Sequence, residues 1–413
     1  MSIFPADSMP ADPAVRLDRA RWLLPVVSAP IEDGVLATRA GRVLAAGPRR
    51  KVLARFQGTV HDHGEAAILP GLVNCHAHLE LTPLAGQVFS SSSDFCGWLA
   101  ALIDHKAARG IEDLREGVRQ GLAQARAFGT ALVADNISPQ VAVFPGLYPD
   151  GQAVALVELL GFAAGRAEER WARAEAAARA LQSAGVEAAL APHSPYTVSR
   201  ALLERCARRG GRLSIHVAES REEVDFLRSG KDSAIRDLLV SRGAWDDGFE
   251  APGGGSPVEY LDQLALLGGK TLAVHLVQAT SADLEILARR GTRACLCPRS
   301  NLALGVGKAP LSAMLALGLA PCLGTDSLAS SPDLNLFREA VAAVNLLGAT
   351  PEVALKMATL WGAEALGRPD LGALVPGCQP QPLVVPVEAG REPCEAVLEA
   401  GARGEVEWLL GEE

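Results

Sequence analysis

The sequence lacks several features that would assign it to common classes. It has no apolar run approaching the roughly 20 residues of a transmembrane helix, and no basic start followed by an apolar core as in a secretory signal. It has no basic block, and its net charge of −9 argues against a nucleic-acid surface. Its eight cysteines are scattered without a Cys-x-x-Cys motif, which excludes a dense disulfide framework. We therefore expect a cytoplasmic protein that binds neither membranes nor nucleic acid.

What the sequence does contain is a long alternation of two patterns. From residue 68, short apolar runs alternate with longer Ala- and Arg-rich segments of helical period, such as 111–128 and 167–185. Eight such runs predict strands at 68–74, 130–136, 152–160, 186–194, 212–220, 271–278, 292–298 and 319–327. Eight strand–helix units predict a (β/α)₈ TIM barrel. A doubly wound parallel sheet is the alternative, because periodicity alone does not show closure.

The two ends of the chain have a different pattern. Short apolar clusters broken by Gly and Asp predict strands before the barrel, at 21–28, 34–47 and 66–70, and after it, at 373–377, 381–388 and 394–410. We expect residues 1–67 and 369–413 to form together a small β-sandwich domain, beside a barrel domain of residues 68–368.

Polar residues gather where the predicted strands end, which is where the chemistry of such barrels lies. Five of the eight histidines and one aspartate are there: His76, His78, His193, His216, His275 and Asp326. Residues two apart on a strand point to the same side, so His76 and His78 can both reach inward. With His216 and Asp326 they would form a nitrogen and oxygen set suited to zinc or ferrous iron. Such an ion lowers the pKa of bound water towards neutrality.

Two further observations bear on the chemistry. Glu219 follows His216 by three residues, where an acidic side chain beside the water could shuttle a proton to the substrate. No lysine occurs between Lys106 and Lys231, so the middle strands offer no carboxylated lysine to bridge two ions. The sequence therefore predicts one divalent metal ion per chain.

Six motifs in order carry a family resemblance: "PGLVNCHAHLE", "APHSPYTVS", "SIHVAES", "AVHLVQ", "CPRSN" and "LGTDSLAS". Together they resemble the amidohydrolase superfamily, in its mononuclear-metal branch of nucleoside deaminases and chlorohydrolases. Within that branch, "HLELT", "DFCGWLAAL", "AESREEVDFLRSG" and "SPVEYLDQLALL" are similar to the aminodeoxyfutalosine and S-adenosylhomocysteine deaminases. The tail segment "VPGCQPQPLVV" departs from the family, because it lacks the Lys and Ala-Asp that many relatives have there.

The resemblance implies roles for nine residues. His76, His78, His216 and Asp326 would hold the metal, Glu219 would be the proton shuttle, and His275 would contact the nucleophilic water. Asp326 or His275 would take the proton from that water. His193, Glu80 and Trp98 would contact the substrate, although Trp98 could equally be a helix residue packed on the barrel mouth.

The implied activity is hydrolytic deamination of the adenine ring of a nucleoside-like substrate, with release of ammonia. Candidate substrates are aminodeoxyfutalosine, S-adenosylhomocysteine, methylthioadenosine and adenosine. Guanine or pterin deamination and triazine chlorohydrolysis stay open as alternatives. A non-catalytic barrel is disfavoured, because the chain keeps every expected ligand and the glutamate. A homodimer is compatible with the sequence.

Overall fold

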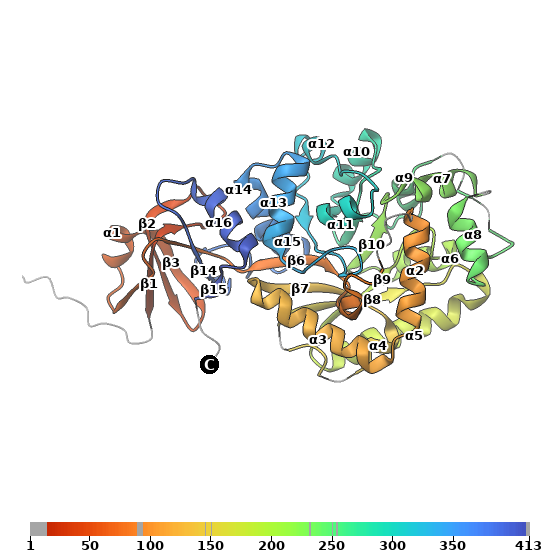
Figure 1. The fold of residues 1–413 in the computed structure, drawn as a ribbon, viewed down its shortest axis with the longest axis horizontal. Helices are drawn as coiled ribbons and strands as arrows, with labels where there is room; N and C mark the ends of the chain where they lie inside the picture. The colour runs from red at the N-terminus through yellow and green to blue at the C-terminus, as the bar shows by residue number, and fades with distance from the viewer. Residues whose placement is uncertain are drawn as a thin grey trace, which may run out of the picture.

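The structure is a computed structural model that describes residues 15–88, 94–144, 146–149, 151–230, 233–249, 251–252 and 255–409. It contains two sheets, a small one at one end of an elongated molecule and a barrel at the other (Figure 1).

The barrel is a sheet of eight parallel strands in sequence order: β6 (Leu72–Ala77), β7 (Thr130–Ile137), β8 (Ala153–Leu159), β9 (Glu187–Pro192), β10 (Leu213–Val217), β11 (Thr271–His275), β12 (Arg293–Leu296) and β13 (Cys322–Leu323). A parallel bridge between Ala77 and Asp326 joins the last strand to the first, and the Asp326 amide donates to the His76 carbonyl at 3.0 Å. This closure confirms the predicted TIM barrel and excludes the doubly wound sheet. Strands β7 and β8 are buried along their whole length, as parallel strands covered on both sides should be.

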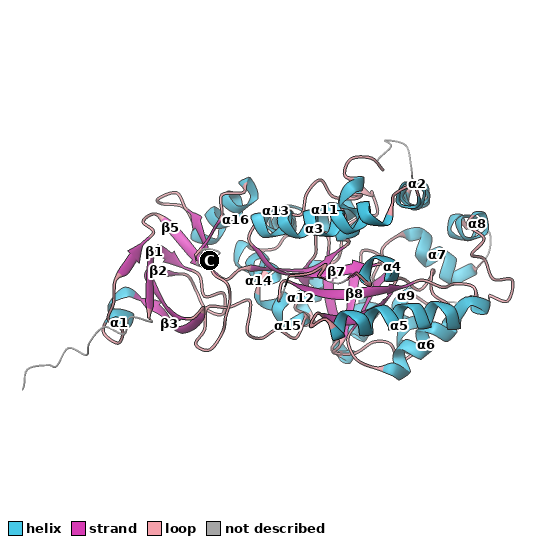
Figure 2. Cartoon of the chain, turned by 90° about the horizontal axis from the view of Figure 1, so that it is seen from below, coloured by secondary structure: helices cyan, strands magenta, loops and turns pink. Residues whose placement is uncertain are grey.

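Helices surround the barrel strands, as Figure 2 shows from a second side. Those associated with the barrel are α2 (Phe95–Ala107), α3 (Ile111–Ala127), α4 (Pro139–Ala142), α5 (Ala167–Ser183), α6 (Arg200–Arg209), α7 (Arg221–Ser229), α8 (Ala234–Ser241), α9 (Pro257–Gln263), α10 (Ser281–Arg290), α11 (Pro298–Ala303), α12 (Leu311–Ala316), α13 (Leu336–Leu347), α14 (Pro351–Ala358) and α15 (Leu360–Ala365). The predicted helices at 111–128 and 167–185 correspond to α3 and α5. Among the described residues, no helix combines the length and hydropathy required to cross a membrane.

Hydroxyl side chains fix where several of these helices begin. Ser220, Ser256 and Thr280 each accept a hydrogen bond from the amide three residues further on, at the start of α7, α9 and α10. Such caps satisfy amides that have no partner within the helix. The caps therefore fix the first residue of each of these helices. Helices α7 and α10 follow the loops after β10 and β11, and α9 precedes β11.

The small sheet combines strands from both ends of the chain. It comprises β1 (Arg16–Leu23), β2 (Ile31–Arg39), β3 (Arg42–Pro48), β4 (Val60–Asp62), β5 (Ala66–Leu69), β14 (Leu383–Pro386) and β15 (Glu407–Trp408). Strand β14 pairs antiparallel with β5, which brings the two ends together (Figure 1). The neighbours Val35 and Leu36 of β2 pack into two different apolar clusters, because successive side chains of a strand point to opposite faces of the sheet.

Three strand predictions were wrong. Residues 373–377 form a bend and a turn and not a strand, with Gly377 in a left-handed conformation at φ 95°. Residues 68–74 are not one barrel strand, because Ile68 and Leu69 pair within the small sheet and the barrel begins at Leu72. Gly71 makes this change of sheet possible, since a Cβ there would lie 2.7 Å from the Gln381 carbonyl oxygen.

The tail 394–410 is mostly helical and not a set of strands. It forms α16 (Pro393–Arg403), which Glu392 caps by accepting from the amides of Cys394 and Glu395. Its close approach to α13 needs Gly401, where a Cβ would lie 2.4 Å from the Phe337 ring. Only β15 remains of the predicted strand.

Candidate metal centre and active site

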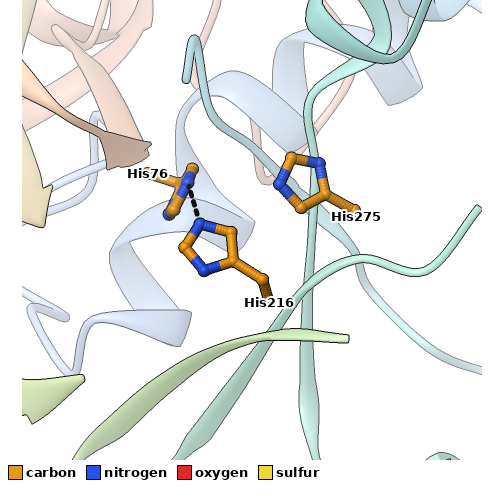
Figure 3. Close-up of side chains that lie close together, drawn as sticks. All are labelled: His76, His216 and His275. Atoms are coloured by element: carbon orange, nitrogen blue, oxygen red, sulfur yellow. Dashed lines mark hydrogen bonds between the residues drawn. The ribbon is translucent and has the colours of Figure 1, made fainter. Parts of the chain in front are cut away.

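Four side chains from three strand ends converge inside the barrel. His76 lies on β6 and His78 just after it, His216 lies on β10, and Asp326 follows β13. The Nε2 atoms of the three histidines lie 3.2 Å from one another. Oδ1 of Asp326 lies 3.7 Å from Nε2 of His76 and of His78. Figure 3 shows His76 and His216 turned towards each other, with His275 beside them.

The donor set fits a divalent metal ion. Tetrahedral ligand atoms at roughly 2.1 Å from an ion lie about 3.4 Å apart. The nitrogen–nitrogen separations of 3.2 Å and the nitrogen–oxygen separations of 3.7 Å lie on either side of that value. Nδ1 of His216 donates to the His193 carbonyl at 2.7 Å, and Nδ1 of His78 faces Oε1 of Glu158 at 3.4 Å. With the protons on Nδ1, the Nε2 lone pairs point to a common centre, which is the arrangement of metal-binding histidines.

Burial sets the charge of these histidines. It holds the pKa of His76 and His216 well below the usual value, so both are neutral, as ligands must be. Burial also lowers the pKa of His78, but the hydrogen bond and charge of Glu158 outweigh it and raise that pKa to about 9. His78 is therefore protonated near neutral pH in the metal-free site, and its Nε2 proton must be displaced when a metal binds, while Glu158 orients its ring.

The carboxylate of Asp326 is oriented by two hydroxyls. Ser300 and Ser330 donate to Oδ2 at 2.5 and 3.0 Å, which leaves Oδ1 directed at the histidines. Asp326 and His275 both have left-handed backbones, with φ of 58° and 75°. Such conformations cost free energy in residues other than glycine and cluster at functional sites.

Glu219 and His275 lie beside the cluster. The amide oxygen of Asn301 accepts from Nδ1 of His275 at 2.9 Å, so Nε2 of the neutral ring carries no proton. This Nε2 lies 3.5 Å from Oε1 of Glu219. Burial raises the pKa of Glu219, the charge of Asp326 adds to this, and the value reaches about 8. A carboxyl group that titrates near neutral pH is suited to both taking and giving a proton.

A cavity of about 340 Å³ opens above these residues, a size typical of small-molecule sites. His193 and Trp98 line it. Nδ1 of His193 lies 3.0 Å from the Thr197 hydroxyl, and burial lowers the pKa of His193 to about 4. Trp98 donates to the Ala329 carbonyl at 3.1 Å, so it packs on the barrel mouth and also lines the cavity.

Glu80 is placed differently from His193 and Trp98. It is fully buried and does not line the cavity. Its Oε2 accepts from the amide and hydroxyl of Ser138, and its Oε1 pairs with Lys106, which does line the cavity. The structure therefore places Lys106 between Glu80 and any bound molecule.

The more exposed part of the cavity wall is basic. Arg166, Arg170 and Arg242 contribute to it. Arg242 pairs with Asp104, whereas Arg166 and Arg170 have no ion-pair partner within the part of the chain that the structure describes. The apolar part of the wall includes Phe95, Leu99, Leu102 and Phe162.

Sequence reasoning missed several residues that support the site. Glu158 and Asn136 also end predicted strands, so the argument used for the histidines would have found them; the Asn136 amide lies 2.8 Å from Nδ1 of His76. Glu223 accepts from the amides of Ala218 and Glu219, at 3.0 and 2.8 Å, and so fixes the backbone that carries Glu219. Glu223 is the third residue after Ser220, and this spacing of a serine and a glutamate signals only the start of a helix.

Comparison with known proteins agrees with this geometry. A family model described as "Amidohydrolase family" matches residues 67–389. The chain is 30% identical over 377 residues to a 5-methylthioadenosine/S-adenosylhomocysteine deaminase of Nitratidesulfovibrio vulgaris, covering 84% of this chain and 78% of that protein. It is 31% identical over 373 residues to the protein of the same name from Moorella thermoacetica, covering 86% and 82%.

Solved structures of similar shape include two deaminases. An adenosine deaminase from Xanthomonas campestris with bound zinc superposes with a TM-score of 0.77 at 27% identity, covering 96% of this chain and 91% of that one. The Helicobacter pylori aminofutalosine deaminase in complex with methylthio-coformycin gives 0.75 at 20% identity, covering 95% and 97%. A triazine hydrolase variant gives 0.77 at 19% identity, covering 95% and 92%. The last two likenesses concern the fold alone.

Proposed function

The chain belongs to the amidohydrolase family, and we propose that it hydrolytically deaminates the adenine ring of a nucleoside-like substrate. The observation that carries this proposal is the convergence of His76, His78, His216 and Asp326 beside Glu219, at the carboxyl ends of the strands of a closed barrel. The chain is a hydrolase of C–N bonds, and its relatives of about 30% identity are named for deamination of adenine nucleosides.

The residues divide the chemistry between them. A divalent ion held by the four ligands would make a water molecule acidic enough to act as the nucleophile near neutral pH. Asp326 or His275 takes a proton from that water, because Asp326 belongs to the cluster and His275 lies directly beside it. Glu219 protonates the ring nitrogen next to the carbon that bears the amino group, which makes that carbon electrophilic. Water adds there, the amino group takes the proton from Asp326 or His275 and leaves as ammonia, and the hydroxyl proton of the adduct returns to Glu219, so the product is the hypoxanthine analogue.

The site also supports proposals about the metal and the substrate. Three imidazoles and one carboxylate suit zinc or ferrous iron, and we favour zinc because the similar Xanthomonas campestris structure contains it. Besides the metal cluster, apolar side chains and the arginines Arg166 and Arg170 line the cavity. This lining favours an adenine nucleoside with a large 5′ substituent, and two arginines without an ion-pair partner among the described residues suit an acidic group on that substituent.

An ammonia-release screen with metal-loaded protein tests the proposal. The substrates are aminodeoxyfutalosine, S-adenosylhomocysteine, methylthioadenosine, adenosine, guanine, a pterin and a chlorinated triazine. We expect 5′-substituted adenine nucleosides to have the highest kcat/KM and to exceed adenosine. A best turnover on guanine, a pterin or a triazine would refute the proposal, and the Glu219→Gln variant serves as the control for contaminating deaminases.

A further inference from the structure

Glu339 is a fully buried carboxyl group to which the proposed chemistry gives no role. It lies in the first turn of α13 and is 0% exposed. Its Oε2 accepts from the backbone amide of Arg299 at 3.0 Å. Its Oε1 has no hydrogen-bond partner among the residues that the structure describes, and lies 3.6 Å from Nη1 of Arg299. Burying a carboxyl group costs free energy, and both contacts that offset this cost are with Arg299.

Helix α11 depends on Glu339 because it does not cap itself. Its N-cap residue Cys297 makes no side-chain hydrogen bond to the helix, and Pro298 at its first position has no N–H. The amide of Arg299 is therefore the first in the helix that needs a partner from outside it. Glu339 supplies that partner from a different helix.

The next two residues of α11 reach the active site. Ser300 donates to Oδ2 of Asp326 at 2.5 Å. The amide oxygen of Asn301 accepts from Nδ1 of His275 at 2.9 Å. Both side chains are buried, so water does not replace either contact. The first turn of α11 therefore orients the two groups to which we assign the proton of the nucleophilic water.

The reach of the Glu339 side chain matters here more than its charge. The guanidinium of Arg299 has another partner, because its two terminal nitrogens donate to Asp333 at 2.8 and 3.1 Å. Burial raises the pKa of Glu339 to about 8, although the charge of Arg299 opposes this, so the carboxyl group is largely protonated near neutral pH. What α11 requires from residue 339 is an acceptor oxygen at the correct distance from the Arg299 amide.

We propose that Glu339 is a positioning residue of the active site, which holds the first turn of α11 so that Ser300 and Asn301 orient Asp326 and His275. The roles of Asp326 and His275 in this inference rest on the proposed function. Glu339 itself touches neither the metal ligands nor the cavity, and acts through the backbone of α11.

Two single substitutions separate reach from charge. Glu339→Gln keeps an acceptor oxygen at the same distance and removes the charge. Glu339→Asp keeps the carboxyl group, but its shorter side chain withdraws the oxygen from the Arg299 amide. The matched control is Asp283→Asn. Asp283 accepts from the amide and hydroxyl of Thr280 at the start of α10, so this change weakens the support of a different helix.

The main measurement is the visible absorption of Co²⁺ bound in place of the native metal, because this absorption depends on the geometry of the ligands. We expect Glu339→Asp to change the absorption and to lower kcat about 10- to 100-fold, as is typical when a group that orients metal ligands is lost. KM should change little, because neither Glu339 nor α11 lines the cavity. Glu339→Gln should keep the native absorption and kcat, and Asp283→Asn should keep both while lowering the melting temperature.

Three results would overturn the inference. One is a Glu339→Asp protein with native absorption and kcat. Another is a Glu339→Gln protein that loses as much as Glu339→Asp, because charge and not reach would then be decisive. The third is an altered absorption in Asp283→Asn, because a general loss of stability would then be enough to disturb the metal centre.

The cobalt absorption does not depend on the substrate, so it separates this inference from the proposed function. Absence of ammonia release from every adenine nucleoside would overturn the proposed function. The absorption of the variants would still decide whether Glu339 positions Asp326 and His275.

Discussion

Replacing Glu219 by glutamine isolates the proton transfer from the rest of the site. The side chain is 6% exposed, and glutamine fills nearly the same volume, so packing should be retained. The backbone amide of residue 219 stays bonded to Glu223, so the loop should keep its shape. What is lost is a carboxyl group that can give a proton to the ring nitrogen and later take one back. Positioned acid–base groups contribute about 100- to 10,000-fold, or about 3 to 5 kcal/mol of barrier.

We therefore expect Glu219→Gln to lower kcat by that factor while KM changes little, because the interaction is gained mainly in the transition state. The assay is steady-state ammonia release by protein samples matched for metal content. Glu222→Gln, a change of the same kind in the first turn of α7, is the control and should keep native activity. A Glu219→Gln protein with full metal content and near-native kcat would refute the reasoning.

Three further predictions concern the metal, the substrate and stability. His216→Ala should lose metal and activity together, and elemental analysis should find one ion per chain in the loaded native protein; retained metal in the variant, or two tightly held ions in the native protein, would contradict the assigned ligands. His193→Ala should keep its metal and mainly raise KM, so metal loss there would reverse its assignment. Burial raises the pKa of Asp333, but hydrogen bonds from Arg299 and the Asn335 amide outweigh this and lower it. Asp333→Asn should therefore reduce the free energy of unfolding by about 2 kcal/mol at neutral pH, and the difference should shrink below about pH 4, where the aspartate of the unfolded chain is protonated. A pH-independent difference in thermal melts would show that the charge is not responsible.

The barrel and the metal cluster could be predicted because both depend on local patterns. Strand periodicity and spacing are visible in the sequence, and parallel strands in a closed barrel place their carboxyl ends on one face. Once His76, His78, His216 and Asp326 are assigned to strand ends, their convergence follows from the fold class. The closing bridge next to Asp326 adds a detail that periodicity does not contain.

The wrong strand predictions lie where contacts between distant parts of the chain determine the secondary structure. Ile68 and Leu69 read as part of a continuous apolar run, and only their pairing with β1 and β14 assigns them to the other sheet. The segment 394–403 has β-compatible valine and leucine, but the cap at Glu392 and packing on α13 make it helical.

The substrate contacts were the least predictable part of the site. Glu80 lies two residues from His78, yet its side chain turns away from the cavity towards Ser138. Lys106 comes from a helix in another part of the chain and carries no motif. Its place at the cavity wall depends on how α2 packs over the barrel mouth, which no local pattern encodes.

In the proposed reaction, water replaces the amino group of an adenine ring at this site. The most direct measurement is turnover of a 5′-substituted adenine nucleoside in oxygen-labelled water, with mass spectrometry of the purine product and quantification of ammonia. We predict one labelled oxygen on the purine product, bound to the carbon that carried the amino group, for each ammonia released, and loss of both in Glu219→Gln. An unlabelled purine, or cleavage of the substrate without ammonia, would contradict it.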